Sequence, residues 1–207
     1  MFQGGDWSIN RYAAVVAEGV EQLSISGCTF SRLDNTGVFL VRAPIAAELT
    51  GVSVALHTAL TPLGCVSLSC REQGGYTRDV AIEGNEFAWL GESAVVSLGD
   101  TAGGPVPGWG VDGTAGDQPR GTKLWYNFGR ELGMINKQSA LYFQAVTDGA
   151  DVRGNVAFNG ARSGANFNDC FGSGSNFSEN VRLTDLFGAS GSRWVLSYVR
   201  RVSTVAL

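Results

Sequence analysis

Lys137 and Arg162 are the two residues whose types and spacing could support catalysis. Each lies in a polar turn just before a strand-like segment, SALYFQ (139–144) for Lys137 and SGANFN (163–168) for Arg162, about two dozen residues apart. If these segments stack, both cations can face one groove. A lysine amine can remove a proton next to a carboxylate while an arginine neutralises that carboxylate. The alternative interpretation is that both are solvated turn residues.

Polar side chains accompany these two cations along the same strand-like segments. By strand alternation, we expect Leu141 and Phe143 to point inward, stacked on Ala165 and Phe167. Tyr142 and Gln144 should point outward, stacked on Asn166 and Asn168. Such a row can bind sugar hydroxyls, or it can merely hold stacked strands together. The candidate substrate-binding residues of this outer face are Tyr142, Gln144, Asn166, Asn168, Asp169 and Arg130.

Carboxylates offer two further kinds of chemistry. Glu131 and Asp169 are weak candidate ligands for Ca²⁺, although no calcium-loop pattern is present and the sequence requires no cofactor. A carboxylate pair could instead hydrolyse glycosides, with Asp112 and Asp117 as additional candidates, but sequence does not give the separation on which that reaction depends. Hydrolysis is therefore a lesser alternative.

Aromatic residues and the single histidine have weaker functional interpretations. Trp89, Trp125 and Phe171 could be platforms on which sugars stack, although an aromatic at a repeated position is more often part of the core. His57 has no serine or cysteine partner implied by spacing, so the sequence gives little support to a catalytic triad.

Internal repetition indicates the elements that position these residues. A phrase of alternating apolar residues, a polar turn and an aromatic recurs as LSISGCTF (23–30), VAIEGNEF (80–87) and ADVRGNVAF (150–158). Weaker copies are NFSENVRL (176–183) and KLWYNFGREL from Lys123. Such units bury a continuous core only by stacking. The sequence therefore predicts an all-β fold, a short single-stranded right-handed parallel β-helix with coils of about two dozen residues.

Asparagines recur at one position of the phrase, as Asn85, Asn155 and Asn180. Asparagine tolerates a left-handed turn and can bond its neighbours in a ladder, so we predict a structural role for all three. A stack of this kind needs capping at its ends, and no cap is evident at either end.

Composition limits the class of protein. The 207 residues are 44% hydrophobic and 16% charged, which indicates one folded domain over residues 1–207, with 42–78 and 188–207 poorly matched to the repeat. The net charge of −4, without a basic run, argues against a nucleic-acid partner, and no apolar stretch suggests a membrane span. The oligomeric state stays open.

The N-terminus and the cysteines give two more expectations. The start MFQGGDWSINRY lacks the features of a signal peptide, and we expect the chain to be a fragment of a longer protein. The four cysteines fit neither a metal pattern nor a dense disulfide framework, so we expect buried free thiols. They are Cys28, Cys65, Cys70 and Cys170.

Three segments carry a resemblance to a known family. They read DGTAGDQPRGT (112–122), GRELGMINKQSALYFQA (129–145) and NVAFNGARSGANFNDCFGSG (155–174). They resemble a family of right-handed β-helix proteins predicted from algal and other protist genomes, which is similar to pectate lyase-like and alginate lyase-like enzymes acting on acidic polysaccharides. The resemblance implies a polysaccharide partner and a secreted or extracellular full-length protein.

The same resemblance suggests roles for the cations. By analogy of spacing with alginate lyase-like β-helices, Lys137 would be the base of a β-elimination, with its pKa lowered by Arg130 or Arg162. Arg162 would bind the carboxylate. After Phe187, however, the chain lacks the histidine-containing phrase of the family. The alternative is therefore a non-catalytic carbohydrate-binding or structural module, or a truncated inactive copy.

Overall fold

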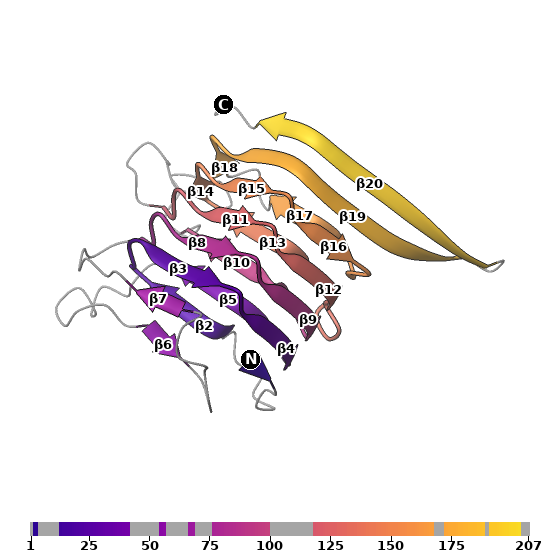
Figure 1. Ribbon diagram of the computed structural model, residues 1–207, viewed down its shortest axis with the longest axis horizontal. Helices are drawn as coiled ribbons and strands as arrows, with labels where there is room; N and C mark the ends of the chain where they lie inside the picture. The colour runs from indigo at the N-terminus through magenta and orange to yellow at the C-terminus, as the bar shows by residue number, and fades with distance from the viewer. Residues whose placement is uncertain are drawn as a thin grey trace, which may run out of the picture.

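A computed structural model shows an all-β protein built from two large sheets of 12 and 6 strands and one small sheet of 2 strands (Figure 1). Among the residues that the structure describes, no helix has the length and apolar character needed to cross a membrane. The residues described by the structure are 2–3, 13–41, 54–56, 66–68, 76–99, 118–167, 172–188 and 191–203.

The six-stranded sheet contains the two strand-like segments that follow Lys137 and Arg162, as β13 and β17. Its order is β17-β13-β10-β5-β2-β6, and all neighbours are parallel except β2 and β6. The bounds are β2 (Ala13–Glu18), β5 (Thr36–Val41), β6 (Val54–Leu56), β10 (Val95–Leu98), β13 (Ala140–Ala145) and β17 (Ser163–Phe167).

The twelve-stranded sheet contains two parallel ladders, which come from the two halves of the repeated phrase. The first ladder is β3 (Leu23–Ser26), β8 (Ala81–Glu83), β11 (Lys123–Trp125) and β15 (Asp151–Arg153). The second is β4 (Thr29–Leu33), β9 (Glu86–Leu90), β12 (Phe128–Leu132) and β16 (Val156–Phe158). The long strand β19 (Asn176–Gly188) pairs with both β15 and β16 and so joins the ladders into one sheet.

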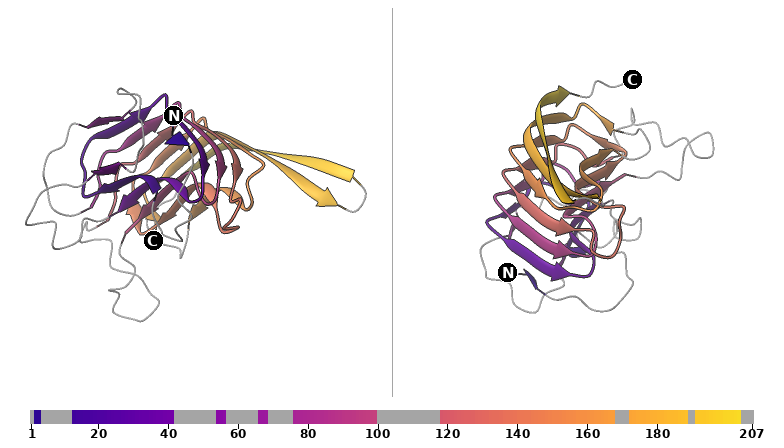
Figure 2. Two further views of the ribbon diagram at one scale, coloured as in Figure 1. Left: turned by 90° about the horizontal axis from the view of Figure 1, so that it is seen from below. Right: turned by 90° about the vertical axis from the view of Figure 1, so that its right-hand side faces the viewer.

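One core lies between the two large sheets, which face each other (Figure 2). Within each sheet, strands from successive repeats lie side by side. Inward residues of the phrase form columns along it, and Phe30 stacks on Phe87 with ring centroids 4.8 Å apart. Gly37 of the six-stranded sheet approaches Phe87 of the other so closely that a Cβ would lie 2.8 Å from its ring. Each fully buried large apolar side chain contributes about 1.5–3 kcal/mol to stability.

The predicted single-stranded, pectate lyase-like β-helix is wrong as a description of this fold, because the strands belong to two large sheets in a sandwich-like arrangement. The number of residues between successive strands of one ladder also varies, whereas the repeat predicted coils of about two dozen residues. The inward residues that follow one another in this ladder are Ile25, Ile82, Leu124, Val152 and Phe177. The phrase specifies strand, turn and strand, and those units are confirmed. A local pattern does not specify how ladders are grouped into sheets, which tertiary packing decides.

Antiparallel strands extend both ends of the twelve-stranded sheet and one end of the six-stranded sheet, contrary to the expectation that neither end is capped. β6 pairs with β2 and β7 (Val66–Leu68) pairs with β3, so the poorly matched segment 42–78 supplies edge strands at the N-terminal end. β1 (Phe2–Gln3) adds to β4 at that end. At the other end β20 (Gly191–Ser203) forms a long hairpin with β19 that projects beyond the other strands (Figure 2). β14 (Thr147–Asp148) and β18 (Gly172–Ser173) form the small sheet.

Candidate functional site

The bend between the two halves of each phrase is built on a residue with positive φ. Glycine serves best there because a Cβ is strained in the left-handed region. Three of the five positions are glycine, and the other two are tyrosine and glutamate. In chain order they are Gly27 (φ 62), Gly84 (φ 63), Tyr126 (φ 54), Gly154 (φ 64) and Glu179 (φ 57).

An asparagine ladder follows this first corner inside the fold. The Oδ1 of Asn127 accepts hydrogen bonds from the backbone N–H and the amide of Asn85, both at 3.0 Å. Asn155 does the same for Asn127, and Asn180 for Asn155. Each side-chain amide also donates to a backbone carbonyl in the preceding copy of the phrase, such as Ile82 O for Asn127 at 2.9 Å. The predicted ladder is confirmed, and Asn127 is a fourth member that the prediction missed.

Cys28 occupies the first position of this ladder. Its backbone N–H donates to Asn85 Oδ1 at 2.8 Å, so it continues the pattern without an amide of its own. Cys28 is disulfide-bonded, which makes the prediction of a buried free thiol wrong for this residue. Cys65, Cys70 and Cys170 lie outside the described residues.

A second corner with positive φ follows a few residues later and contains no glycine. It lies near the ends of β4, β9 and β12 and just after β16, at Arg32 (φ 55), Trp89 (φ 52), Glu131 (φ 51) and Asn159 (φ 46). Only asparagine among these types commonly tolerates the conformation. Trp89 is 39% exposed, so burial compensates little of its strain. The expectation that an aromatic at a repeated position belongs to the core is wrong at Trp89.

Two arginines flank the Trp89 ring. The Arg130 guanidinium carbon lies 3.9 Å from the ring centroid, and that of Arg32 lies 5.8 Å away. Arg130 also forms an ion pair with Glu86 at 2.9 Å, and Phe128, 38% exposed, lies beside Glu86 in the register of β9 and β12. We call the surface formed by Arg32, Glu86, Trp89, Phe128 and Arg130 the Trp89 face.

Trp125 lies between two cations as well, but its polar group is occupied. Its indole Nε1 donates to Asp151 Oδ2 at 2.9 Å, and the same carboxylate accepts from Arg153 at 3.4 Å and from Asn176 at 2.8 Å. Lys123 and Arg153 lie 5.5 Å and 4.8 Å from its ring. Trp125 is half-buried, and the carboxylate of Asp151 on β15 links it to Asn176 on β19. This arrangement is suited to holding the sheet together.

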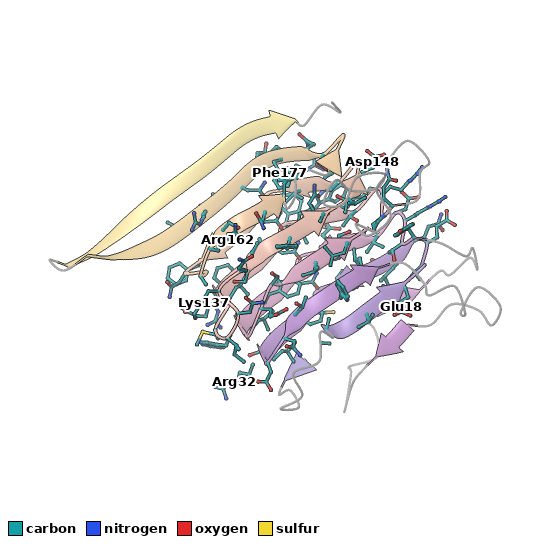
Figure 3. All side chains as sticks on the ribbon, turned by 180° about the vertical axis from the view of Figure 1, so that it is seen from behind. Glu18, Arg32, Lys137, Asp148, Arg162 and Phe177 are labelled. Carbon is teal, nitrogen blue, oxygen red and sulfur yellow. The ribbon has the colours of Figure 1, made fainter. Side chains whose placement is uncertain are left out.

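The predicted catalytic cations lie on one side of the molecule, together with Arg32 (Figure 3). Lys137 is exposed, and its ammonium donates to the carbonyls of Gly133 at 2.8 Å and Met134 at 3.0 Å. Arg162 is exposed and donates to the side chain of Gln138 at 3.2 Å. Both hydrogen bonds therefore hold the Lys137 ammonium against carbonyls of its own turn. The catalytic roles of Lys137 and Arg162 stay a prediction.

The predicted outer groove fails at two of its residues. Tyr142 and Gln144 are 0% exposed and point into the core, whereas Phe143 is half-buried on the outer row. In the structure Tyr142 pairs with Ala165 and Phe143 with Asn166, one residue away from the predicted register. Because side chains alternate along a strand, a shift of one residue exchanges the inward and outward sides of β13. Asn166 is half-buried, and Asn168 and Asp169 lie outside the described residues.

Burial raises the pKa of Tyr142 well above its usual range, because the charged phenolate is disfavoured away from water. The neighbouring hydroxyls of Ser97, Thr147 and Thr122 oppose this shift without cancelling it. Tyr142 is therefore a neutral interior group and takes no part in surface chemistry.

Carboxylate chemistry finds little support in the part of the chain that is described. Both oxygens of Glu131 accept hydrogen bonds from the Asn159 amide, at 3.0 and 2.8 Å, so this candidate calcium ligand is already engaged. No group of three or more histidine, cysteine, aspartate or glutamate side chains that could hold a metal ion occurs among the described residues. Predicted residues outside them are His57, Asp112, Asp117, Asp169 and Phe171.

Comparison with known proteins assigns no relative. No protein-family model matches this chain, and no curated protein or solved structure matches it. The resemblance to the algal and protist family therefore stays a prediction, and the candidate site rests on its own geometry.

Proposed function

We propose that this protein is a non-catalytic binding module that holds an acidic polysaccharide on the Trp89 face. The observation that carries the proposal is Trp89 itself, a large aromatic that is 39% exposed at a corner with φ 52. Left-handed conformation costs a residue with a Cβ about 1–2 kcal/mol. Sequences break local preferences of this kind mainly at functional sites.

The chemistry of the face fits a sugar that bears a carboxylate. Arg130 occupies one face of the Trp89 ring, and the exposed parts of Trp89 and Phe128 offer apolar surface to the C–H face of a sugar. Arg32 makes no ion pair with a described residue, so its guanidinium is available for a carboxylate in a bidentate arrangement. A platform flanked by guanidinium groups favours a uronate over a neutral sugar.

The remaining candidate residues favour binding over elimination. Lys137 is engaged with two carbonyls of its own turn, and Tyr142 and Gln144 are buried. A general base must reach the proton that it removes with a free electron pair. The cations that the lyase prediction requires are therefore better suited to attracting a polyanion than to removing a proton.

A binding titration tests the proposal. The protein is titrated by calorimetry with polygalacturonate, alginate and a neutral glucan, and we expect binding to the two polyuronates only. Trp89→Asn should weaken that binding by about tenfold or more, since stacking and cation contacts of this kind contribute about 1–2 kcal/mol. Tyr126→Asn is the matched control, because Tyr126 is a 56% exposed aromatic at a corner with φ 54 outside the Trp89 face.

Three results would contradict the proposal. Equal affinity for the neutral glucan would remove the role of the arginines, and unchanged affinity in Trp89→Asn would remove the site. Release of unsaturated uronate, detected by its ultraviolet absorbance and lost in Lys137→Ala, would show that the protein is a lyase.

A further inference from the structure

A cluster of polar side chains lies inside the core, away from the Trp89 face. Ser97 on β10 and Tyr142 and Gln144 on β13 are 0% exposed, and Thr147 at the start of β14 is 4% exposed. Ser97 and Gln144 are register partners on adjacent strands. Asp148, the neighbour of Thr147, lies on the side of the molecule opposite Arg32, Lys137 and Arg162 (Figure 3).

The polar atoms of this cluster have no hydrogen-bond partner within the described part of the chain. These atoms are Ser97 Oγ, Tyr142 Oη, Thr147 Oγ1 and both the Nε2 and the Oε1 of Gln144. The Tyr142 hydroxyl is close enough to those of Ser97, Thr147 and Thr122 to feel their dipoles, but the geometry of a direct hydrogen bond is not reached. The Tyr142 hydroxyl therefore has three polar neighbours and no hydrogen-bond partner among the described residues.

Direct burial of these atoms without partners is energetically unfavourable. Each unsatisfied buried donor or acceptor costs about 1–3 kcal/mol, and five such atoms would cost a large part of the stability of a domain this size. The next strand offers no polar group to relieve them, since Ala165 and Phe167 are the register partners of Tyr142 and Gln144. A buried water makes two to four hydrogen bonds and suits a site with several convergent polar groups.

We infer that ordered water molecules are bound in the interior between Ser97, Tyr142, Gln144 and Thr147. A water there can donate to Gln144 Oε1 and accept from Gln144 Nε2 or the Tyr142 hydroxyl. The hydroxyls of Ser97 and Thr147 can rotate to donate or accept as required. The site is a hydrated polar layer within the core, and it is independent of polysaccharide binding.

Water-selective nuclear Overhauser spectroscopy tests this inference on the intact protein. We expect cross-peaks from long-lived water to the Gln144 side-chain amide and the Tyr142 hydroxyl. ¹⁷O relaxation dispersion should also show water that stays bound longer than the protein takes to rotate. Absence of both signals would overturn the inference and would mean that the Gln144 amide bonds directly to its neighbours.

Substitutions locate the signal. Gln144→Leu should remove most of the dispersion amplitude, whereas Gln138→Leu, the same change at an exposed glutamine, should leave it unchanged. Tyr142→Phe removes one partner of the water while keeping the ring, so it serves if Gln144→Leu does not fold. A dispersion amplitude that is the same in the wild type and in Tyr142→Phe and Gln144→Leu would place the bound water elsewhere and contradict the inference.

Discussion

Two of the columns of left-handed corners that run along the twelve-stranded sheet use opposite kinds of sequence. In the first, glycine stands at Gly27, Gly84 and Gly154, and the residues that follow form the asparagine ladder. In the second no glycine occurs, and Arg32 and Trp89 keep large side chains on the outside. The first column matches the needs of the backbone. The second departs from them where the proposed ligand binds.

The largest effect that separates the two columns is expected for Asn127→Ala. The change removes the acceptor of the backbone N–H and the side-chain amide of Asn85, and it interrupts the ladder towards Asn155. Loss of several buried hydrogen bonds should lower the free energy of unfolding by about 3–5 kcal/mol. Chemical denaturation measures it, with Asn136→Ala as the exposed control, which should cost less than about 1 kcal/mol. Similar losses for both would show that the ladder contributes little.

A smaller effect is expected at the glycines of the first column. A Cβ at Gly84 meets no atom within 4 Å, so Gly84→Ala should cost only the strain of the left-handed backbone, about 1 kcal/mol. A Cβ at Gly154 would lie 2.5 Å from the Tyr126 ring, so Gly154→Ala should cost about 2 kcal/mol.

A double-mutant cycle identifies the source of the extra cost at Gly154. In the background of Tyr126→Gly, Gly154→Ala should fall to the value of Gly84→Ala, because the ring that obstructs the Cβ is gone. Equal costs at Gly84 and Gly154 in the wild type would mean that the Tyr126 ring moves aside freely.

The smallest change in stability is expected for Trp89→Asn. Asparagine relieves the left-handed strain, as Asn159 does in the same column, and this gain offsets the lost contact of the ring with Arg130. The free energy of unfolding should change by less than about 0.5 kcal/mol. Thermal and chemical denaturation check it. A loss above about 2 kcal/mol would instead assign Trp89 a structural role. The strain at Trp89 would then no longer support a binding function.

The sequence predicted the asparagine ladder because a repeated phrase with one fixed polar position has few other structural uses. It missed Asn127 because Tyr126 replaces the glycine that marks the corner in the clearest copies. The grouping of strands into two large sheets could not be predicted, since it depends on contacts such as Gly37 against Phe87 between segments distant in sequence.

The candidate site was harder to predict than the ladder. Tyr142 and Gln144 were placed outside because three consecutive bulky residues, Leu141 to Phe143, leave the alternation ambiguous, and an error of one residue in register reverses both faces. The exposure of Trp89 follows from a left-handed corner that has no glycine to reveal it. Neither feature has a local signal in the sequence.

The central claim is that the ligand lies on Trp89 and not on Trp125. Each tryptophan has one indole N–H, so a two-dimensional ¹H–¹⁵N spectrum, assigned with Trp89→Asn and Trp125→Phe, reports on both during titration with an oligouronate. The account predicts a saturable shift of the Trp89 indole signal and little change at Trp125, whose N–H stays bonded to Asp151. A shift at Trp125 with Trp89 unchanged, or no shift at either, would contradict it.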